Sequence, residues 1–303
     1  PGGKAVYPSS VVMNVVPAQV ANVPRIAVSS PAQENGLPSP SVMATCALLG
    51  IDEVYGIGGA SAIAAFAYGV PEIGLERVAM VTGPGNIFVA AAKRQLRGVI
   101  GIDSEAGPTE ILIVADESAN PRFLAADLIS QAEHDQNAAA VLVTDSASLI
   151  EQVEAELLVQ AGLAKNRDRI EASLVGIQSA LVLVADMNAA MAVANEYATE
   201  HLEIQTANPE ELARQVRHAG AVFVGAYSPV SLGDYLAGSN HVLPTGQQAK
   251  FSSGLSVFTF LRTQQHVTYS ADALAKVADS LRVFSEAERL SAHGRAGSIR
   301  LEE

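Results

Sequence analysis

The chain has little cysteine, no tryptophan and few basic residues, and each shortage excludes a class of protein. One cysteine in 303 residues excludes an intrachain disulfide framework and a metal site built from cysteines, which is typical of a reducing compartment such as the cytoplasm. Nineteen Lys and Arg against 32 Asp and Glu give a net charge of −13, which argues against nucleic acid or an anionic membrane as partner. No apolar run reaches the length of a membrane span.

What the chain has instead is a core supplied mostly by Ala, Val, Leu and Ile, since aromatic residues make up only 5%. Strand-like apolar runs alternate with helix-like segments, a pattern typical of βαβ units. We therefore predict an α/β fold with two Rossmann-like parallel-sheet domains and a C-terminal helical tail, bounded at residues 1–110, 111–250 and 251–303. Expected strands are 25–29, 53–57, 77–81, 111–115, 139–144, 180–185, 202–205 and 221–225. Expected helices are 40–49, 60–67, 87–96, 121–134, 148–159, 187–197, 209–218 and 271–293.

Two glycine turns join a strand to a helix in the first domain. Gly56-Ile57-Gly58-Gly59 is not a GxGxxG fingerprint, and Gly83-Pro84-Gly85-Asn86 places an asparagine where it can cap the next helix. A helix N-terminus of this kind can also face a phosphate. Tight-turn chemistry and cofactor binding both remain open for these segments.

Four of the six histidines lie in short polar clusters. Gln131 and His134 share one helix face at i, i+3 spacing, so an amide oxygen and an imidazole could meet one ion, although a histidine at a helix C-terminus explains the same pattern. Glu200-His201 lies between a helix and a strand and offers two groups for proton transfer, or is a solvated loop pair.

The other two clusters differ in how strongly they indicate a site. Asp234 and His241 lie in a segment interrupted by glycines and ended by a proline, which is rigid enough to hold ligands. Glu288 and His293 lie in a charged helical stretch, where an exposed amphipathic helix is the simpler interpretation. Cys46, within an apolar run, is interpreted as a small core residue.

Nine stretches along the chain together resemble the histidinol dehydrogenase family. In chain order they are PGGKAVYPSSV, GIGGASAIAAFAYG, GPGN, IDSEAGPTEILIVAD, DLISQAEHD, EYATEHLEIQT, GDYLAGSNHVLPT, FSSGLSVFTF and EAERLSAH. The resemblance runs from residue 1 to the C-terminus. It implies a cytoplasmic enzyme with one Zn²⁺ per subunit that oxidises L-histidinol to L-histidine through the aldehyde, using two NAD.

The resemblance also assigns roles to individual residues. The zinc ligands would be Gln131, His134, Asp234 and His293, an amide, a carboxylate and two imidazoles that suit Zn²⁺. His201 would take the alcohol proton, and Glu200 would activate water for attack on the aldehyde. The remaining contacts would be Thr109, His241 and Glu288 to substrate, besides His201 and the metal ligands, and Asn86 and Ser61 to NAD.

The family is dimeric, so Glu288 and His293 in the tail would complete the active site of the partner subunit. The first domain would bind NAD, and the second would carry the zinc and catalytic residues. Ser61 stands where many members have glutamine, and Thr109 where serine is common. The chain begins without methionine at a motif that family members reach only after a longer segment, so we expect it to be a truncated form.

Two alternatives stay open from the sequence. One is a related zinc-dependent dehydrogenase for another small polyol or a sulfonated diol, although His241 and Glu288 favour a substrate with an imidazole and an amine. The other is a non-catalytic fragment that only binds zinc or a partner subunit.

Overall fold

The computed structural model describes residues 6–302 and divides the chain into two units, residues 1–261 and 262–303. The motif Pro1-Gly2-Gly3-Lys4, which contributes to the family resemblance, lies outside the described residues. Among the residues described, no helix is both long and apolar enough to cross a membrane.

The first part of unit 1 alternates helices with short parallel strands. It consists of α1 (Pro8–Val20), β1 (Ala27–Ser29), α2 (Pro40–Leu48), β2 (Glu53–Tyr55), α3 (Gly59–Tyr68), η1 (Pro71–Ile73), β3 (Met80–Val81), α4 (Ile87–Leu96) and β4 (Gly101–Ile102). β1 pairs with β2 and β3 with β4, both parallel. Two apolar clusters fill this region, one around Val15 and Cys46 and one around Phe66 and Leu75. Cys46 is thus a core residue, as predicted.

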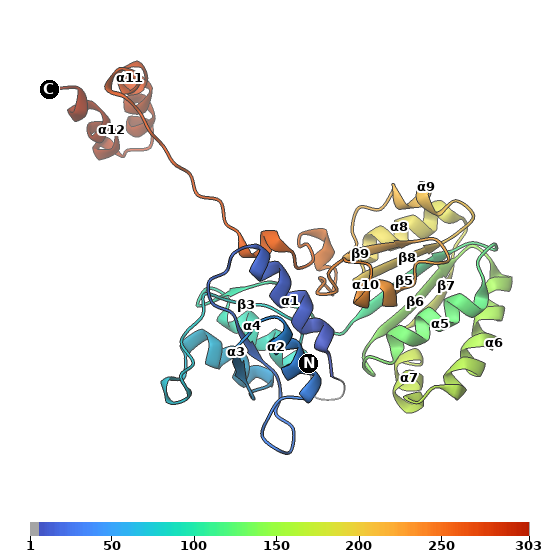
Figure 1. Ribbon diagram of the computed structural model, residues 1–303. Helices are drawn as coiled ribbons and strands as arrows, with labels where there is room; N and C mark the ends of the chain where they lie inside the picture. Colours follow the sequence, from blue (N-terminus) through green and yellow to red (C-terminus); the bar gives the residue numbers. More distant parts are fainter. Residues whose placement is uncertain (1–5, 303) are drawn as a thin grey trace. The chain divides into compact units, whose positions relative to one another are not determined.

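The second part of unit 1 is built on a five-stranded parallel sheet with the order β7-β6-β5-β8-β9 (Figure 1). Its strands are β5 (Glu110–Ala115), β6 (Ala139–Thr144), β7 (Ala180–Leu183), β8 (His201–Gln205) and β9 (Ala221–Val224). The helices are α5 (Pro121–Ala132), α6 (Ala147–Leu163), α7 (Arg167–Leu174), α8 (Met187–Tyr197), α9 (Pro209–Ala213) and α10 (Val230–Tyr235), followed by η2 (Gln248–Lys250) and η3 (Val257–Phe260).

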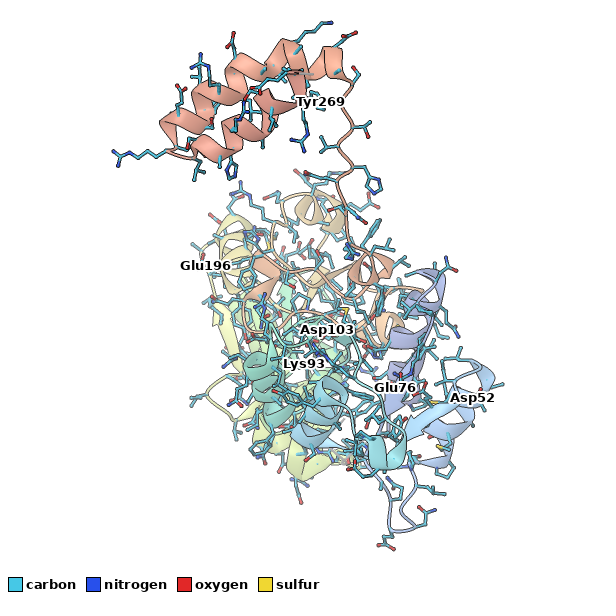
Figure 2. All side chains as sticks on the ribbon, turned by 90° about the vertical axis from the view of Figure 1, so that its left-hand side faces the viewer. Asp52, Glu76, Lys93, Asp103, Glu196 and Tyr269 are labelled. Carbon is cyan, nitrogen blue, oxygen red and sulfur yellow. The ribbon has the colours of Figure 1, made fainter. Side chains whose placement is uncertain are left out.

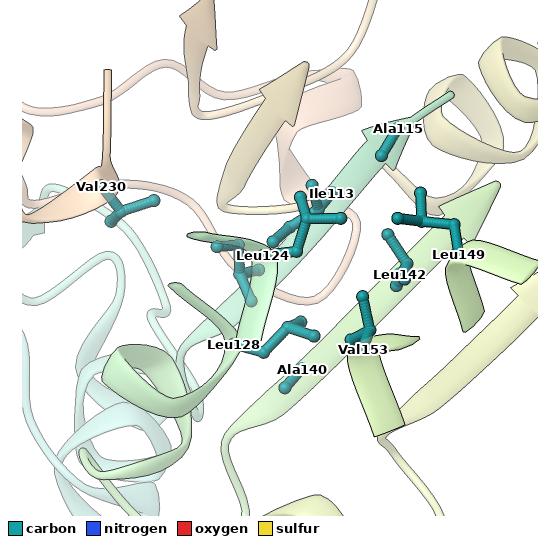
Figure 3. Close-up of a cluster of buried hydrophobic side chains, with 10 residues drawn as sticks. Ile113, Ala115, Leu124, Leu128, Ala140, Leu142, Leu149, Val153 and Val230 are labelled. Atoms are coloured by element: carbon teal, nitrogen blue, oxygen red, sulfur yellow. The ribbon is translucent and has the colours of Figure 1, made fainter. Parts of the chain in front are cut away.

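Helices cover both faces of this sheet, so its central strands are buried on both sides. Figure 3 shows one face, where Ile113 of β5 packs against Leu124 and Leu128 of α5, with Val230 from the start of α10. On the other face, α8 packs over Leu112, Val114 and the matching residues of β6 and β8. Burial of both faces explains why β5 and β6 are continuous apolar runs in the sequence.

Unit 2 is a helical pair, α11 (Ala271–Ala287) and α12 (Ser291–Ser298), ended by η4 (Ile299–Leu301). The predicted α/β fold with parallel sheets and a C-terminal helical segment is confirmed. Several local expectations were wrong. The single tail helix is two helices that turn at Arg289, which has a φ of 58°, α9 is shorter than expected, and β8 begins one residue earlier, so His201 lies inside the strand.

Candidate active site

Three of the predicted site residues lie at the amino-terminal edge of the five-stranded sheet. Thr109 directly precedes β5, Glu200 directly precedes β8, and Gln131 lies near the end of α5. A helix that follows a parallel strand runs back antiparallel to it, so the end of α5 returns to the edge where β5 and β8 begin. Open α/β sheets usually bind ligands at the opposite, carboxyl edge. The candidate site of this chain lies instead at the edge where the strands begin.

Glu200 is a buried carboxyl held by two donors. Its Oε2 accepts hydrogen bonds from the Thr109 hydroxyl and, at 3.0 Å, from the backbone N–H of Glu110. Burial nevertheless raises the pKa of Glu200 to about 8, with a further contribution from the Asp234 charge, while the two donors oppose the rise. A carboxyl with a pKa near neutrality can both take and give a proton at working pH.

His201 is buried beside Glu200 and is a neutral imidazole. Burial lowers its pKa to about 4, although Asp234 and a backbone contact to Glu110 oppose the shift. Its Nδ1 lies 3.2 Å from the carbonyl oxygen of Glu110, so Nδ1–H donates to that oxygen and Nε2 is the basic nitrogen. Nδ1 is also 3.7 Å from Glu200 Oε2, but this is no ion pair near neutral pH, because both groups are then uncharged.

Gln131 is joined to Glu200 through Thr109. The Gln131 side chain is 1% exposed, and its Nε2 donates to Thr109 Oγ1 at 2.5 Å. Thr109 then donates to Glu200, so a predicted metal ligand, a predicted substrate contact and a predicted base form one hydrogen-bonded series. Use of the amide nitrogen for Thr109 leaves the amide oxygen as the atom of Gln131 suited to bind a cation.

Asp234, His134 and His241 lie within electrostatic range of this series. The Asp234 carboxylate acts on the pKa of His134, Glu200 and His201. Burial lowers the pKa of His134, and Asp234 partly opposes that shift. His241 places Nδ1 3.1 Å from the carbonyl oxygen of Asp234. The structure thus brings together all the site residues predicted in residues 109–241.

Asp234 is carried by a helix that the sequence did not predict. Residues 230–235 were interpreted as a rigid segment and form α10, with Gly233 inside it. A Cβ at Gly233 would lie 2.7 Å from the ring of Phe223, so only glycine allows α10 to approach β9 this closely. The ring of Phe223 also lies against His201, with centroids 6.0 Å apart.

The donor chemistry of the site suits a zinc ion. Within the described residues, no three His, Cys, Asp or Glu side chains are grouped so as to hold a metal. Of the predicted ligands, only His134 and Asp234 in unit 1 belong to those types, because Gln131 is an amide and His293 belongs to unit 2. An oxygen, an imidazole nitrogen and a carboxylate are ligands that Zn²⁺ accepts, and a fourth ligand must come from elsewhere.

Three residues of the site were missed by the sequence analysis. Ser10 Oγ lies 3.1 Å from His241 Nε2, and the ring of Tyr7 stacks on that of His134 with an interplanar angle of 6°. Glu110, next to Thr109, has a pKa raised to about 7 by burial, and the neighbouring Glu200 adds to the rise. Only Glu110 carried a signal, as an acidic residue at the start of an apolar strand.

The predicted NAD contacts lie at the first turns of two helices that pack together, α3 and α4. Ser61 is exposed in the first turn of α3. Asn86 caps α4, as predicted, because its Oδ1 accepts from the N–H groups of Phe88 and Val89 at 3.0 and 3.1 Å. Both residues are therefore at exposed helix N-termini, which favour anionic groups.

A buried ion pair holds the loop that precedes Asn86. Lys93 and Asp103 face each other in Figure 2, with Lys93 Nζ 2.5 Å from Asp103 Oδ1 and 2.5 Å from the carbonyl oxygen of Gly83. Asp103 Oδ2 accepts from the N–H of Gly83 at 2.7 Å. Both polar groups of Gly83, which has a φ of 112°, are thus fixed by this pair.

Glu288 and His293 belong to unit 2. Glu288 is the C-cap residue directly after α11, His293 lies in the first turn of α12, and both side chains are exposed. The exposed positions of Glu288 and His293 agree with the interpretation of this stretch as an exposed amphipathic helix. They also leave both side chains accessible to a ligand.

Comparison with known proteins gives a consistent result. The family model for histidinol dehydrogenase matches residues 1–301. Histidinol dehydrogenase of Leifsonia xyli subsp. xyli is 59% identical over 305 residues, covering 100% of this chain and 70% of the relative, and that of Thermobifida fusca is 61% identical over 303 residues, covering 99% and 69%. The crystal structure of histidinol dehydrogenase from Elizabethkingia anophelis has a TM-score of 0.93 at 35% identity and covers 100% of this chain and 69% of that one.

A more distant likeness shows the fold alone. An acetylating aldehyde dehydrogenase from Geobacillus thermoglucosidasius has a TM-score of 0.51 at 14% identity, covering 86% of this chain and 74% of that one.

The structure has a parallel α/β fold with a buried carboxyl–imidazole pair, and the comparisons make the chain an NAD-dependent oxidoreductase. The chain belongs to the histidinol dehydrogenase family. Membership agrees with the resemblance seen in the sequence motifs.

Proposed function

We propose that this chain is a zinc-dependent histidinol dehydrogenase that catalyses the last step of histidine biosynthesis. L-Histidinol would be oxidised to L-histidinal and then, with one water, to L-histidine, and each step would pass a hydride to NAD. The observation that carries the proposal is the buried series Gln131–Thr109–Glu200 beside a neutral His201. It supports the proposal because a carboxyl with a raised pKa and a neutral imidazole lie together at one edge of the sheet.

In the first step, His201 Nε2 would take the alcohol proton as the hydride leaves carbon. The hydrogen bond from Nδ1 to the Glu110 carbonyl fixes the tautomer that has Nε2 free. The low pKa of His201 keeps it unprotonated and ready at neutral pH. The same hydrogen bond would stabilise the imidazolium formed after proton transfer.

In the second step, Glu200 would take a proton from the water that adds to the aldehyde. Thr109 and the Glu110 N–H hold one oxygen of Glu200, so the other oxygen is the one available to water. Loss of the second hydride from the hydrate then gives the carboxylate. The raised pKa of Glu200 makes it a stronger base than an exposed carboxylate once it is ionised.

Gln131, His134 and Asp234, with His293 from a tail, would hold the zinc ion. When bound there, zinc orients the substrate through its imidazole and amine nitrogens. His241 and Glu288 would contact the substrate, and Ser61 and Asn86 the NAD. In this proposal residues 1–110 bind NAD, residues 111–250 carry the catalytic residues, and residues 251–303 complete the site of the partner in a cytoplasmic homodimer.

Metal removal tests the proposal. Treatment with a chelator should abolish NADH formation from L-histidinol, and stoichiometric Zn²⁺ should restore it, whereas Mg²⁺ should not, because Mg²⁺ disfavours imidazole ligands. Asp234→Ala should abolish the recovery, and Asp168→Ala, an exposed acid on α7, serves as matched control. Full activity of the chelated, zinc-free chain would contradict the proposal.

A further inference from the structure

One face of β8 is polar although it is buried. His201, Glu203 and Gln205 pair in register with Ile111, Ile113 and Ala115 of β5, so they point to the face covered by α5. Glu203 is 0% and Gln205 is 3% exposed. Neighbouring strands place apolar residues on this face, and a buried carboxyl there needs a partner.

The partner of Glu203 is a second carboxyl, Asp127 of α5. The two side chains are in hydrogen-bond contact, and the Gln205 amide nitrogen bridges them, 3.1 Å from Asp127 Oδ2 and 3.2 Å from Glu203 Oε2. Within the described residues, Glu203 Oε1 has no hydrogen-bond partner. A proton shared by the two carboxyls would make Glu203 a donor toward Asp127.

The burial of the pair agrees with one shared proton. Burial raises the pKa of Asp127 to about 6, and it raises that of Glu203 well above its usual value, with the Asp127 charge adding to the rise. The groups that act on the pair are the Gln205 amide of β8 and the backbone N–H of Val230 in α10, which donates to Glu203. Neither group supplies a positive charge that would let both carboxyls ionise.

The pair touches three elements, each close to a residue of the active site. Asp127 lies one helical turn before Gln131, Glu203 lies two residues along β8 from His201, and Val230 lies one turn before Asp234. The network thus ties α5, β8 and α10 together at one point. A change in the separation of the two carboxyls would move Gln131 and Asp234 relative to His201.

We propose that Asp127 and Glu203 share one proton and act as positioning residues that hold α5 and α10 at the spacing the metal ligands Gln131 and Asp234 require. This rests on the proposed function, because these two residues are metal ligands only under it. Loss of one carboxyl leaves the other buried without its partner, so variants of the pair are expected to lose stability whichever role the pair has. A purely structural role would change unfolding alone, and a positioning role would also change the zinc affinity of the folded chain.

Zinc affinity of the full chain, measured with chelator-buffered Zn²⁺, tests the proposal. Glu203→Leu should weaken zinc binding by the folded chain roughly 10–100-fold, the usual effect of losing a partner behind a metal ligand. Glu203→Gln keeps an N–H donor toward Asp127 and should leave zinc affinity close to that of the wild type. Glu154→Leu, on an exposed position of α6, is the matched control.

Infrared spectroscopy tests the shared proton without reference to metal or activity. The protonated-carboxyl band at neutral pH should lose one component in Glu203→Gln, because the new amide donates to Asp127 and leaves it ionised. In Asp127→Asn the component should shift in frequency, because the buried Glu203 keeps its proton but donates to a different acceptor. This measurement decides the proposal even if Glu203→Leu fails to fold.

Three results would overturn the proposal: zinc affinity of Glu203→Leu equal to wild type, Glu203→Gln as damaging as Glu203→Leu, or no change in the carboxyl band. A wild-type chain that bound no zinc would overturn it as well. Its failure is separable from that of the proposed function, because turnover of histidinol by the wild type is measured independently. Wild-type zinc binding with the expected variant effects but no histidinol turnover would refute the function and leave the positioning role standing.

Discussion

Replacement of Glu200 by glutamine should separate the two oxidation steps. Glutamine has nearly the same volume and its amide oxygen can accept from the Thr109 hydroxyl and from the Glu110 N–H, which lies 3.0 Å from Glu200 Oε2. Because Glu200 has a pKa near 8, it is largely uncharged at pH 7, so the change leaves no unpaired charge in the site. The chain should therefore fold and bind substrate as before.

The expected loss falls on the aldehyde step alone. A positioned general base contributes about 10²–10⁴-fold, or roughly 2.7–5.4 kcal/mol at 1.36 kcal/mol per tenfold. Glu200→Gln should lose that factor with L-histidinal as substrate. The first hydride transfer from L-histidinol should change by less than about tenfold, since His201 alone takes that proton and loses only a neighbouring dipole.

Single-turnover formation of NADH measures both steps. Wild type should form two NADH per bound histidinol, and Glu200→Gln should form one rapidly and the second slowly. Glu154→Gln, at an exposed position of α6, is the control. Equal loss in both steps would refute the assignment of Glu200 to water activation.

Two further predictions concern stability. Lys93→Met should lower the free energy of unfolding by about 3–5 kcal/mol in chemical denaturation, because it leaves Asp103 charged and buried; the side chains of this pair are 2% and 4% exposed. Lys250→Met breaks a more exposed pair with Glu196, with side chains 28% and 83% exposed, and should change the free energy of unfolding much less. Equal effects of the two variants would contradict the role of burial. The zinc-free chain should lose stability as pH rises from 6.5 through 8.5, since folded Glu110 and Glu200, with pKa values of about 7 and 8, retain protons that the unfolded chain has released. A thermal midpoint that rises over this interval would show that the carboxyls are ionised in the folded chain.

Most of the second sheet could be predicted from the sequence because burial on both faces leaves a clear signal. β6 and α8 begin and end at the expected residues, and β5 differs by one. α10 was missed because six residues with a central glycine show no helical period, and its position depends on contact with Phe223. α1 also lacks the usual sequence pattern of a helix, because Pro17 lies inside it.

The candidate site could likewise be predicted from the sequence only in part. Gln131, Glu200 and His201 were found from their motifs, but their connection through Thr109 depends on which strands are neighbours in the sheet. The pairing of Asp127 with Glu203 gives no local signal, since 76 residues separate two carboxyls that meet only when α5 packs on β8. Predicted roles for Glu288 and His293 remain predictions, because they depend on a second subunit.

The measurement that tests the central claim most directly is the number of NADH formed per L-histidinol by the zinc-loaded 303-residue chain. The account predicts two NADH per histidinol, with L-histidine as product and loss of both on removal of zinc. No NADH from histidinol, or one NADH with histidinal released as the end product, would contradict it.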